Sequence, residues 1–217
     1  PTLAPYAKEG EVELRITAKA ATKDEAAALI APVETEVRTL LGSLVYGADV
    51  TSLEQVVLGQ LKEKGLTLGT AESCTGGLIA KRMTDLPGAS AVFRGGVVSY
   101  VNDVKRDVLG VPQALLDEQG AVCADVAEAM ARGARRVLGC DLAVSATGVA
   151  GPDSDERGNP VGLVYVALAG PEGCWVRKLN LAGPGDRRDR ARTLAASHCF
   201  DMVRRYLAGL PVEAAKP

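Results

Sequence analysis

The chain has 217 residues, 47% of them hydrophobic, so it can bury one good core and leave a small appendage. Its charges nearly balance at a net −2, which argues against a general polyanion-binding surface. One histidine excludes a histidine-rich zinc site, and five scattered cysteines without a C-x-x-C pair favour reduced thiols over a disulfide framework.

Residues 1–50 predict a small appendage of the form β-α-β. Residues 11–20 alternate apolar and polar side chains, which indicates a half-buried strand. Residues 23–41 carry apolar side chains at helical spacing, with a kink expected at Pro32. Leu44-Val45-Tyr46 then favours a second strand. Because the segment has no G-x-x-G clamp for nucleic acid, we interpret it as a packing or dimerisation element.

The rest of the chain, residues 51–217, predicts strands that alternate with helices. Ser52 begins a helix that Gly65 ends, and Pro112 opens a shorter one. Strands that alternate with helices and then form a strand pair indicate a layered α/β/α sandwich with a mixed sheet. The expected strands are residues 66–69, 97–100, 142–146, 161–169 and 175–181, and the main expected helices are residues 52–64, 78–83, 102–109, 125–138 and 189–207.

A serine stands at one strand-to-helix junction, in the octet Thr70-Ala71-Glu72-Ser73-Cys74-Thr75-Gly76-Gly77. The first turn of a helix has unpaired amides that favour negative charge, and two glycines let a substrate approach those amides closely. Ser73 is therefore a candidate nucleophile, with helix capping by Ser73 or Thr75 as the simpler alternative. Cys74 is a second candidate, because a helix N-terminus can lower the pKa of a thiol.

Hydrolysis by a serine also needs a base. His198 lies in an Ala/Leu/Phe-rich helical stretch, and we interpret it as structural. A lysine can serve instead if burial or nearby cations bring its pKa towards neutrality. Lys105 follows Tyr100 by five residues, across a strand end and one helical turn, so both side chains can face one pocket. Taken alone, a lysine in such a turn is usually a solvated surface residue.

Further blocks follow residues 71–80 (AESCTGGLIA) in a fixed order. They are residues 96–105 (GVVSYVNDVK), 109–111 (LGV), 120–122 (GAV), 146–152 (ATGVAGP) and 160–162 (PVG). These six blocks together resemble the C-terminal domain of the CinA family over residues 51–208. The resemblance implies a nicotinamide mononucleotide deamidase, which releases nicotinate mononucleotide and ammonia. Residues 1–50 resemble the KH-like segment that precedes this domain in longer CinA proteins, so we expect a C-terminal fragment.

The resemblance also implies a role for each matching residue. Ser73 is the expected nucleophile, Lys105 the base, and Tyr100 a proton relay or orienting donor. The expected substrate contacts are an oxyanion hole made by main-chain amides of Thr75, Gly76 and Gly77, a contact from Thr147, and phosphate binding by Arg188, with Arg187 in reserve. Arg188 is preferred because it precedes Arg192 by four residues, as the family's arginine precedes a second one. No metal and no cofactor are implied.

Two features depart from the family pattern. Residues 153–159 form an acidic loop in place of a glycine-rich one, and we interpret them as a solvated loop rather than a cation site. Cys123 stands where serine is common. A serine/lysine amidase acting on another amide and a non-enzymatic partner-binding module linked to competence or damage both stay open as alternatives.

The expected partners are a small nucleotide substrate and a second copy of the chain, with no nucleic acid and no membrane. No signal peptide opens the sequence and no apolar run has the length to cross a bilayer, so we expect a cytoplasmic protein.

Overall fold

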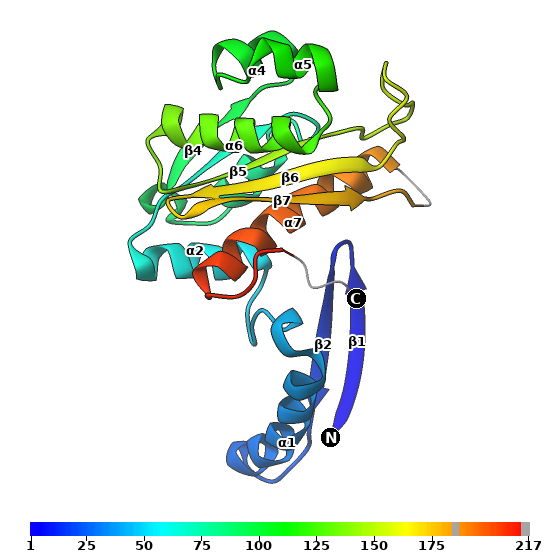
Figure 1. Cartoon of the computed structure of the whole chain (residues 1–217). Coiled ribbons are helices and arrows are strands. Elements are labelled where there is room, and N and C mark those ends of the chain that lie inside the picture. The colour runs from blue at the N-terminus through cyan, green and yellow to red at the C-terminus, as the bar shows by residue number, and fades with distance from the viewer. Residues whose placement is uncertain (184–186, 214–217) are drawn as a thin grey trace. The chain divides into compact units, whose positions relative to one another are not determined.

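The chain divides into two units, Pro1–Asp49 and Val50–Pro217. The computed structural model of the protein describes residues 1–183 and 187–213, and of Arg187 the main chain only. Figure 1 shows both units.

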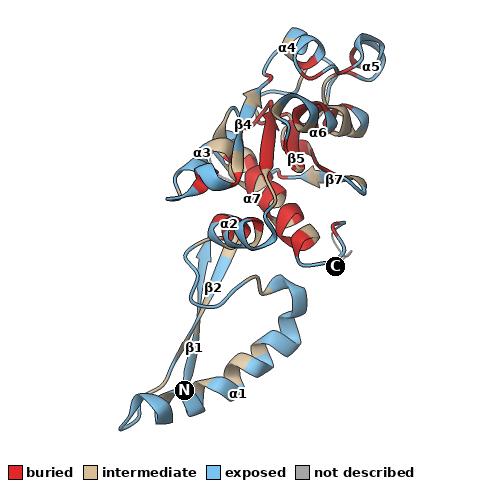
Figure 2. Ribbon diagram, turned by 90° about the vertical axis from the view of Figure 1, so that its left-hand side faces the viewer, coloured by how far each residue is buried: buried red, intermediate tan, exposed pale blue. Residues whose placement is uncertain are grey.

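The first unit is a hairpin and a helix. Strands β1 (Thr2–Lys8) and β2 (Glu11–Thr17) pair antiparallel. Helix α1 (Lys23–Leu41) begins with a capping box, in which Thr22 and Glu25 satisfy each other's main-chain amides, and it continues through Pro32. None of residues 1–49 is buried, and Figure 2 shows the hairpin and α1 mostly in the colour of exposed residues.

The order of elements in this unit is strand, strand, helix, which corrects the expected β-α-β order. Residues Gly42–Leu44 form a 3-10 turn, and the segment after it is held by a hydrogen bond from Tyr46 Oη to Glu11 Oε2 (2.5 Å) and not by a strand ladder. Strand β1 was not expected from the sequence, because Pro5 interrupts the strand pattern there. A proline is tolerated there because β1 is an edge strand of a two-stranded sheet.

The second unit is built on a five-stranded mixed sheet, as expected. Its strands are β3 (Leu68–Glu72), β4 (Phe93–Val98), β5 (Leu142–Gly148), β6 (Leu163–Gly170) and β7 (Gly173–Asn180). The spatial order is β4-β3-β5-β6-β7. β3 runs parallel to both of its neighbours, whereas β5, β6 and β7 pair antiparallel in succession. The carboxyl ends of β3, β4 and β5 therefore lie at one edge of the sheet.

Helices cover both faces of this sheet, which confirms the α/β/α sandwich. Figure 1 shows α6 (Ala124–Leu138) on one face, and α7 (Arg187–Leu207) with α2 (Leu53–Lys64) on the other. α3 (Leu78–Thr84) packs against α7, and α5 (Gln113–Gln119) packs against α6. The remaining helices are α4 (Asn102–Asp107) and the short 3-10 helix Ala89–Ala91.

The core on the α6 side depends on one close approach. A Cβ atom on Gly133 would lie 2.1 Å from the Leu109 carbonyl oxygen, so a side chain there would push α6 away from the segment after α4. The buried residues of this core are Ala71, Leu109, Val111, Leu116, Val126, Met130, Ala134, Cys140 and Ala143. No helix in the described part of the chain combines the length and apolar character that spanning a bilayer requires.

Candidate active site

Ser73 lies at the carboxyl end of β3, where the main chain turns towards α3. Its amide donates to the Ala146 carbonyl on β5 (2.9 Å), and its own carbonyl accepts from the Gly76 amide (3.1 Å). Gly76 and Gly77 have φ values of 59° and 93°, in the left-handed region that favours glycine. These contacts fix a tight turn in which Ser73 is only 9% exposed.

The carboxylate of Glu72 holds the start of α3, a role that the sequence analysis missed. Glu72 is fully buried, and its two carboxylate oxygens accept from the amides of Ile79 (3.0 Å) and Ala80 (2.8 Å). The Thr70 hydroxyl donates to it as well (3.2 Å). These bonds satisfy two amides that a helix N-terminus leaves unpaired. Glu72 therefore caps α3, a role for which Ser73 or Thr75 was the simpler expectation.

Lys105 reaches Ser73 from α4 and is almost completely buried, at 1% exposure. Its Nζ lies 3.1 Å from Ser73 Oγ, 2.8 Å from the Ser99 carbonyl and 3.2 Å from the Tyr100 carbonyl. Burial lowers the pKa of Lys105 to about 8, with nearby Cys74 opposing that shift. A substantial fraction of this amine is therefore neutral near physiological pH.

The three partners of Lys105 Nζ orient the neutral amine. A neutral amine has two N–H donors and one lone pair, and carbonyl oxygens can only accept hydrogen bonds. The Ser99 and Tyr100 carbonyls therefore take both N–H groups, and the lone pair faces the Ser73 hydroxyl. This is the arrangement in which a lysine removes a proton from a serine.

Tyr100 and Arg188 form a second contact further out. Tyr100 follows β4, which ends at Val98 and not at residue 100 as expected, and it is 58% exposed. Its hydroxyl accepts from Arg188 Nη2 (3.1 Å), and Arg188 Nη1 donates to the Gly151 carbonyl (2.7 Å). Tyr100 thus meets Lys105 through its carbonyl and Arg188 through its hydroxyl. The reserve candidate, the Arg187 side chain, lies outside the described residues.

The other groups expected to contact the substrate differ in whether they already have a hydrogen-bond partner. The Gly76 amide donates to Ser73, whereas the Gly77 amide has no acceptor among the described residues. Thr147 is 1% exposed, and its hydroxyl donates to the Ala121 carbonyl (2.6 Å). The Thr75 hydroxyl is buried without a hydrogen-bond partner in the described part of the chain. The Gly77 amide is therefore available to donate to a substrate, whereas the Thr147 hydroxyl already donates to a carbonyl.

Arg192 also touches the Ser73 turn. Its Nε and Nη2 both donate to the Thr75 carbonyl, at 3.3 and 2.9 Å. No contact with the Ser73 turn was expected for Arg192 from the sequence, where only its spacing from Arg188 was informative. The helical offset of four residues was the signal that both arginines share one face of α7.

The two alternative catalytic groups have unsuitable surroundings. Burial raises the pKa of the Cys74 thiol to about 12, so this group stays protonated at neutral pH and is a poor nucleophile. His198 Nδ1 lies 3.5 Å from Arg177 Nη1, and burial lowers the pKa of the imidazole. Its described contacts do not include Ser73 or Lys105, in keeping with a structural histidine.

The acidic loop is organised by its own side chains. Asp155 accepts from the amides of Arg157 (3.1 Å) and Asn159 (2.8 Å), and from Asn159 Nδ2 (2.8 Å). Arg157 in turn donates to carbonyls at the end of α5, including that of Glu118 (2.9 Å). Within the described residues, no three His, Cys, Asp or Glu side chains gather as a metal site would require.

Comparison with known proteins shows which family has this sequence and fold. A family model described as the CinA C-terminal domain matches residues 50–207, and one described as the damage-inducible protein CinA KH domain matches residues 1–47. The chain belongs to the CinA family. It is 50% identical to a CinA-like protein of Desulfovibrio desulfuricans over 99% of this chain and 50% of that one. A putative competence-damage inducible protein of Caldanaerobacter subterraneus is 48% identical over 98% of this chain and 51% of its own length. The chain therefore spans about half the length of these CinA relatives.

Solved structures of the family have the same C-terminal fold. A competence/damage inducible protein from Agrobacterium tumefaciens, named CihA, superposes with a TM-score of 0.66 at 37% identity, over 72% of this chain and 93% of that one. A CinA superfamily protein from Klebsiella pneumoniae gives a TM-score of 0.68 at 27% identity, over 73% and 99%.

Proposed function

We propose that this CinA domain hydrolyses the carboxamide of nicotinamide mononucleotide to nicotinate mononucleotide and ammonia. The observation that carries the proposal is the buried contact between Lys105 Nζ and Ser73 Oγ (3.1 Å). The substrate itself is inferred from the six sequence blocks shared with CinA deamidases. The structure thus supports the chemistry of the site, and the sequence blocks support the choice of substrate.

The first step forms an ester on Ser73. Lys105 accepts the hydroxyl proton while Ser73 Oγ attacks the carboxamide carbon, and the carbonyl oxygen becomes an oxyanion. The Gly77 amide, which has no acceptor among the described residues, is a suitable donor to that oxyanion. The Lys105 ammonium then gives its proton to the amide nitrogen, the C–N bond breaks, and ammonia leaves.

The second step restores the enzyme. Lys105 is neutral again once ammonia has taken the proton, so it can activate a water molecule in turn. The resulting hydroxide attacks the ester carbonyl, the bond to Ser73 Oγ breaks, and Ser73 recovers its proton from Lys105. The products are nicotinate mononucleotide and the unmodified serine, and no external oxidant or reductant is required.

In this proposal, residues around the Ser73–Lys105 contact bind the substrate. Arg188 presents a planar guanidinium beside Tyr100 and the Gly151 loop, which suits a two-donor grip on a phosphate. Binding energy at the phosphate would align the distant carboxamide with Ser73. Thr147 would contribute mainly by shaping the pocket wall, since its hydroxyl already donates to Ala121.

The experiment is to measure ammonia release by the purified chain from a panel of amides. The panel contains nicotinamide mononucleotide, its riboside, free nicotinamide and unrelated amides such as glutamine, and the Ser73→Ala variant is the control. The proposal expects the nucleotide to be the best substrate and Ser73→Ala to be inactive. Preference for an unrelated amide would establish a different amidase, and no ammonia from any amide would favour a partner-binding module.

A further inference from the structure

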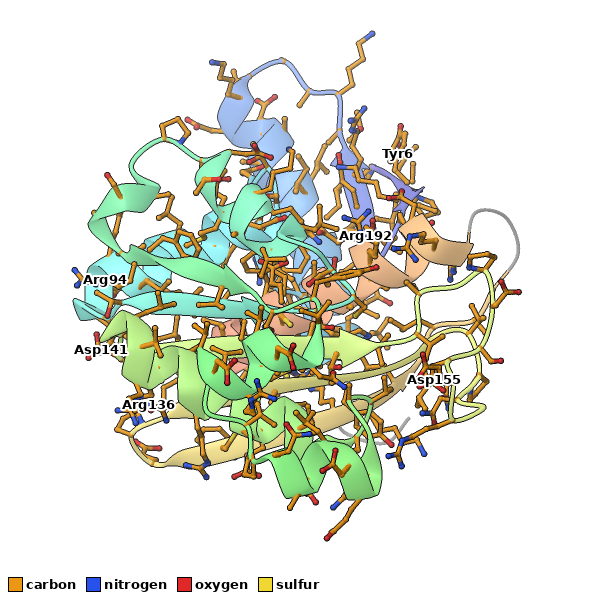
Figure 3. All side chains as sticks on the ribbon, turned by 90° about the horizontal axis from the view of Figure 1, so that it is seen from above. Tyr6, Arg94, Arg136, Asp141, Asp155 and Arg192 are labelled. Carbon is orange, nitrogen blue, oxygen red and sulfur yellow. The ribbon has the colours of Figure 1, made fainter. Side chains whose placement is uncertain are left out.

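A cavity of about 280 Å³ lies at the end of the sheet opposite Ser73. Its lining residues are Arg132, Arg135, Arg136, Cys140 and Ala169. The arginines belong to the last turns of α6, just before β5 begins at Leu142, whereas Ser73 follows the carboxyl end of parallel strand β3. In Figure 3, Arg136 lies well away from Arg192, which touches the Ser73 turn.

Two of these arginines are anchored by neutral groups. Arg135 donates to the carbonyls of Asp141 (2.9 Å) and Gly170 (3.2 Å), and Arg136 donates to the Leu109 carbonyl (2.8 Å). Such bonds fix a guanidinium in place without neutralising its charge. Arginines at a helix C-terminus interact favourably with the helix dipole, which explains their presence there but leaves most of their donors unused.

The cavity has an excess of positive charge. Arg132 pairs with Glu128 (2.7 Å), and the described residues that line the cavity include no carboxylate. Asp141, which follows Cys140, directs its carboxylate to the amide and hydroxyl of Thr67 (2.8 and 2.6 Å), and nearby Arg135 helps to lower the pKa of this carboxyl group. Burial raises the pKa of the Cys140 thiol to about 11, so this group adds no negative charge near neutral pH. Three guanidiniums face the paired carboxylate of Glu128 and the more distant one of Asp141, so the cavity keeps an excess of positive charge that an anion matches.

Unused donors point to the same class of ligand. Each guanidinium has five N–H donors. Among the described residues, Arg135 uses two of them and Arg132 and Arg136 use one each. Guanidiniums with free pairs of donors suit the two-oxygen edges of phosphate groups. The small volume also favours a small ligand over an extended polymer.

We propose that this cavity is a second anion site, which binds the phosphate group of a small phosphate monoester. It is separate from the catalytic site at Ser73, and its occupancy does not depend on the proposed amidase reaction. A ligand bound there would tie the end of α6 to the β6–β7 turn through Arg135 and would stabilise the folded chain by mass action.

The test uses the full chain with Ser73→Ala, so that no turnover occurs. The arginine side-chain Nε–H signals are followed by NMR during titration with glycerol 3-phosphate, and with glycerol as the neutral control. We expect saturable shifts of the Arg132, Arg135 and Arg136 signals with the phosphate ester only. Unmoved cavity signals at ester concentrations that shift Arg188 would overturn the proposal. So would a DNA oligonucleotide that shifts the cavity signals at lower concentration than the ester.

A matched pair of variants completes the test. Arg132→Gln removes one cavity charge, and Arg38→Gln removes a similarly exposed arginine that is paired with Glu34 (2.7 Å) at the same i,i+4 spacing. We expect Arg132→Gln to weaken binding at the cavity signals about tenfold and Arg38→Gln to leave it unchanged. Equal behaviour of the two variants would contradict a built site. In the Ser73-containing chain, Arg132→Gln is expected to keep normal ammonia release.

Discussion

The candidate active site has an inner contact and an outer one, and they are held in different ways. The inner contact joins Ser73 to Lys105, which is 1% exposed and held by two main-chain carbonyls. The outer contact joins Tyr100, at 58% exposure, to Arg188 through side-chain atoms. Main-chain carbonyls hold the buried amine of the inner contact, whereas the outer contact joins two exposed side chains, of which Arg188 also donates to the Gly151 carbonyl.

In the proposed function, the inner contact performs the chemistry and the outer contact recognises the phosphate of the substrate. Burial disfavours the charged form of an amine, and a lowered pKa of this kind is typical of groups that transfer a proton. An exposed arginine keeps its charge and can exchange its partners for those of a ligand. We therefore expect changes to the inner contact to reduce turnover of every substrate. Changes to the outer contact should discriminate between substrates that have a phosphate and those that lack one.

Ser73→Ala is the most severe change to the inner contact. We expect kcat for the nucleotide to fall by about a thousandfold or more, because the covalent route is lost, while nucleotide binding stays near normal. Steady-state ammonia release and calorimetric binding measure the two effects. Cys74→Ala is the matched control next to it and should stay active. A dead Cys74→Ala with an active Ser73→Ala would make the thiol the nucleophile.

Lys105→Met should have the next largest effect. Methionine keeps much of the volume of the buried side chain but cannot accept a proton, so kcat should fall by about 100- to 10,000-fold. Thermal unfolding distinguishes this loss from misfolding. A correctly folded Lys105→Met with normal kcat would remove lysine from the mechanism.

Arg188→Ala tests the outer contact. We expect a loss of about 1.5–3 kcal/mol in transition-state binding for the nucleotide, roughly 10- to 150-fold in kcat/KM, and little change for the riboside. Lysine at this position should restore only part of the loss, because it lacks the planar pair of donors. Arg187→Ala is the neighbouring control. A selective loss in Arg187→Ala alone would move the phosphate role to that residue, and equal losses on both substrates would contradict a phosphate role.

Glu72→Gln should have the smallest effect on turnover and a clear effect on stability. A glutamine oxygen can accept from only one of the Ile79 and Ala80 amides, and its NH2 group would face the other. We expect the free energy of unfolding to fall by about 1–3 kcal/mol, as seen by urea denaturation. Arg188→Ala should leave it unchanged. An unaltered urea midpoint for Glu72→Gln would show that the carboxylate is not what holds the turn.

Much of the fold could be predicted from local patterns. Periodicity and caps located the helix between Ser52 and Gly65, and the strand patterns came close to the bounds of β5, β6 and β7. The first strand was not predictable in this way, because Pro5 breaks the strand pattern and only its pairing with β2 makes it a strand. β3 and β4 were also misplaced: residues 66–69 and 97–100 were expected, whereas the strands run over Leu68–Glu72 and Phe93–Val98, the range in which they pair with each other.

The residues of the site could be predicted from the sequence, but the contacts that orient them could not. The family blocks pointed to Ser73 and Lys105, and the structure brings these two side chains together. Nothing in the sequence indicated that two main-chain carbonyls would orient Lys105, or that Glu72 would hold the start of α3. Both effects depend on where strands end, which residue types alone do not determine.

The most direct test of the central claim is the pH dependence of kcat/KM for ammonia release. A neutral Lys105 is required to take the Ser73 proton, so activity should rise with pH through about 8, the value to which burial lowers this pKa. The riboside is measured in parallel, because it has no phosphate that titrates, and Ser73→Ala provides the background of spontaneous hydrolysis. The account predicts the same rise near pH 8 for both substrates. A rate that climbs only near pH 10, where an ordinary lysine titrates, would contradict it.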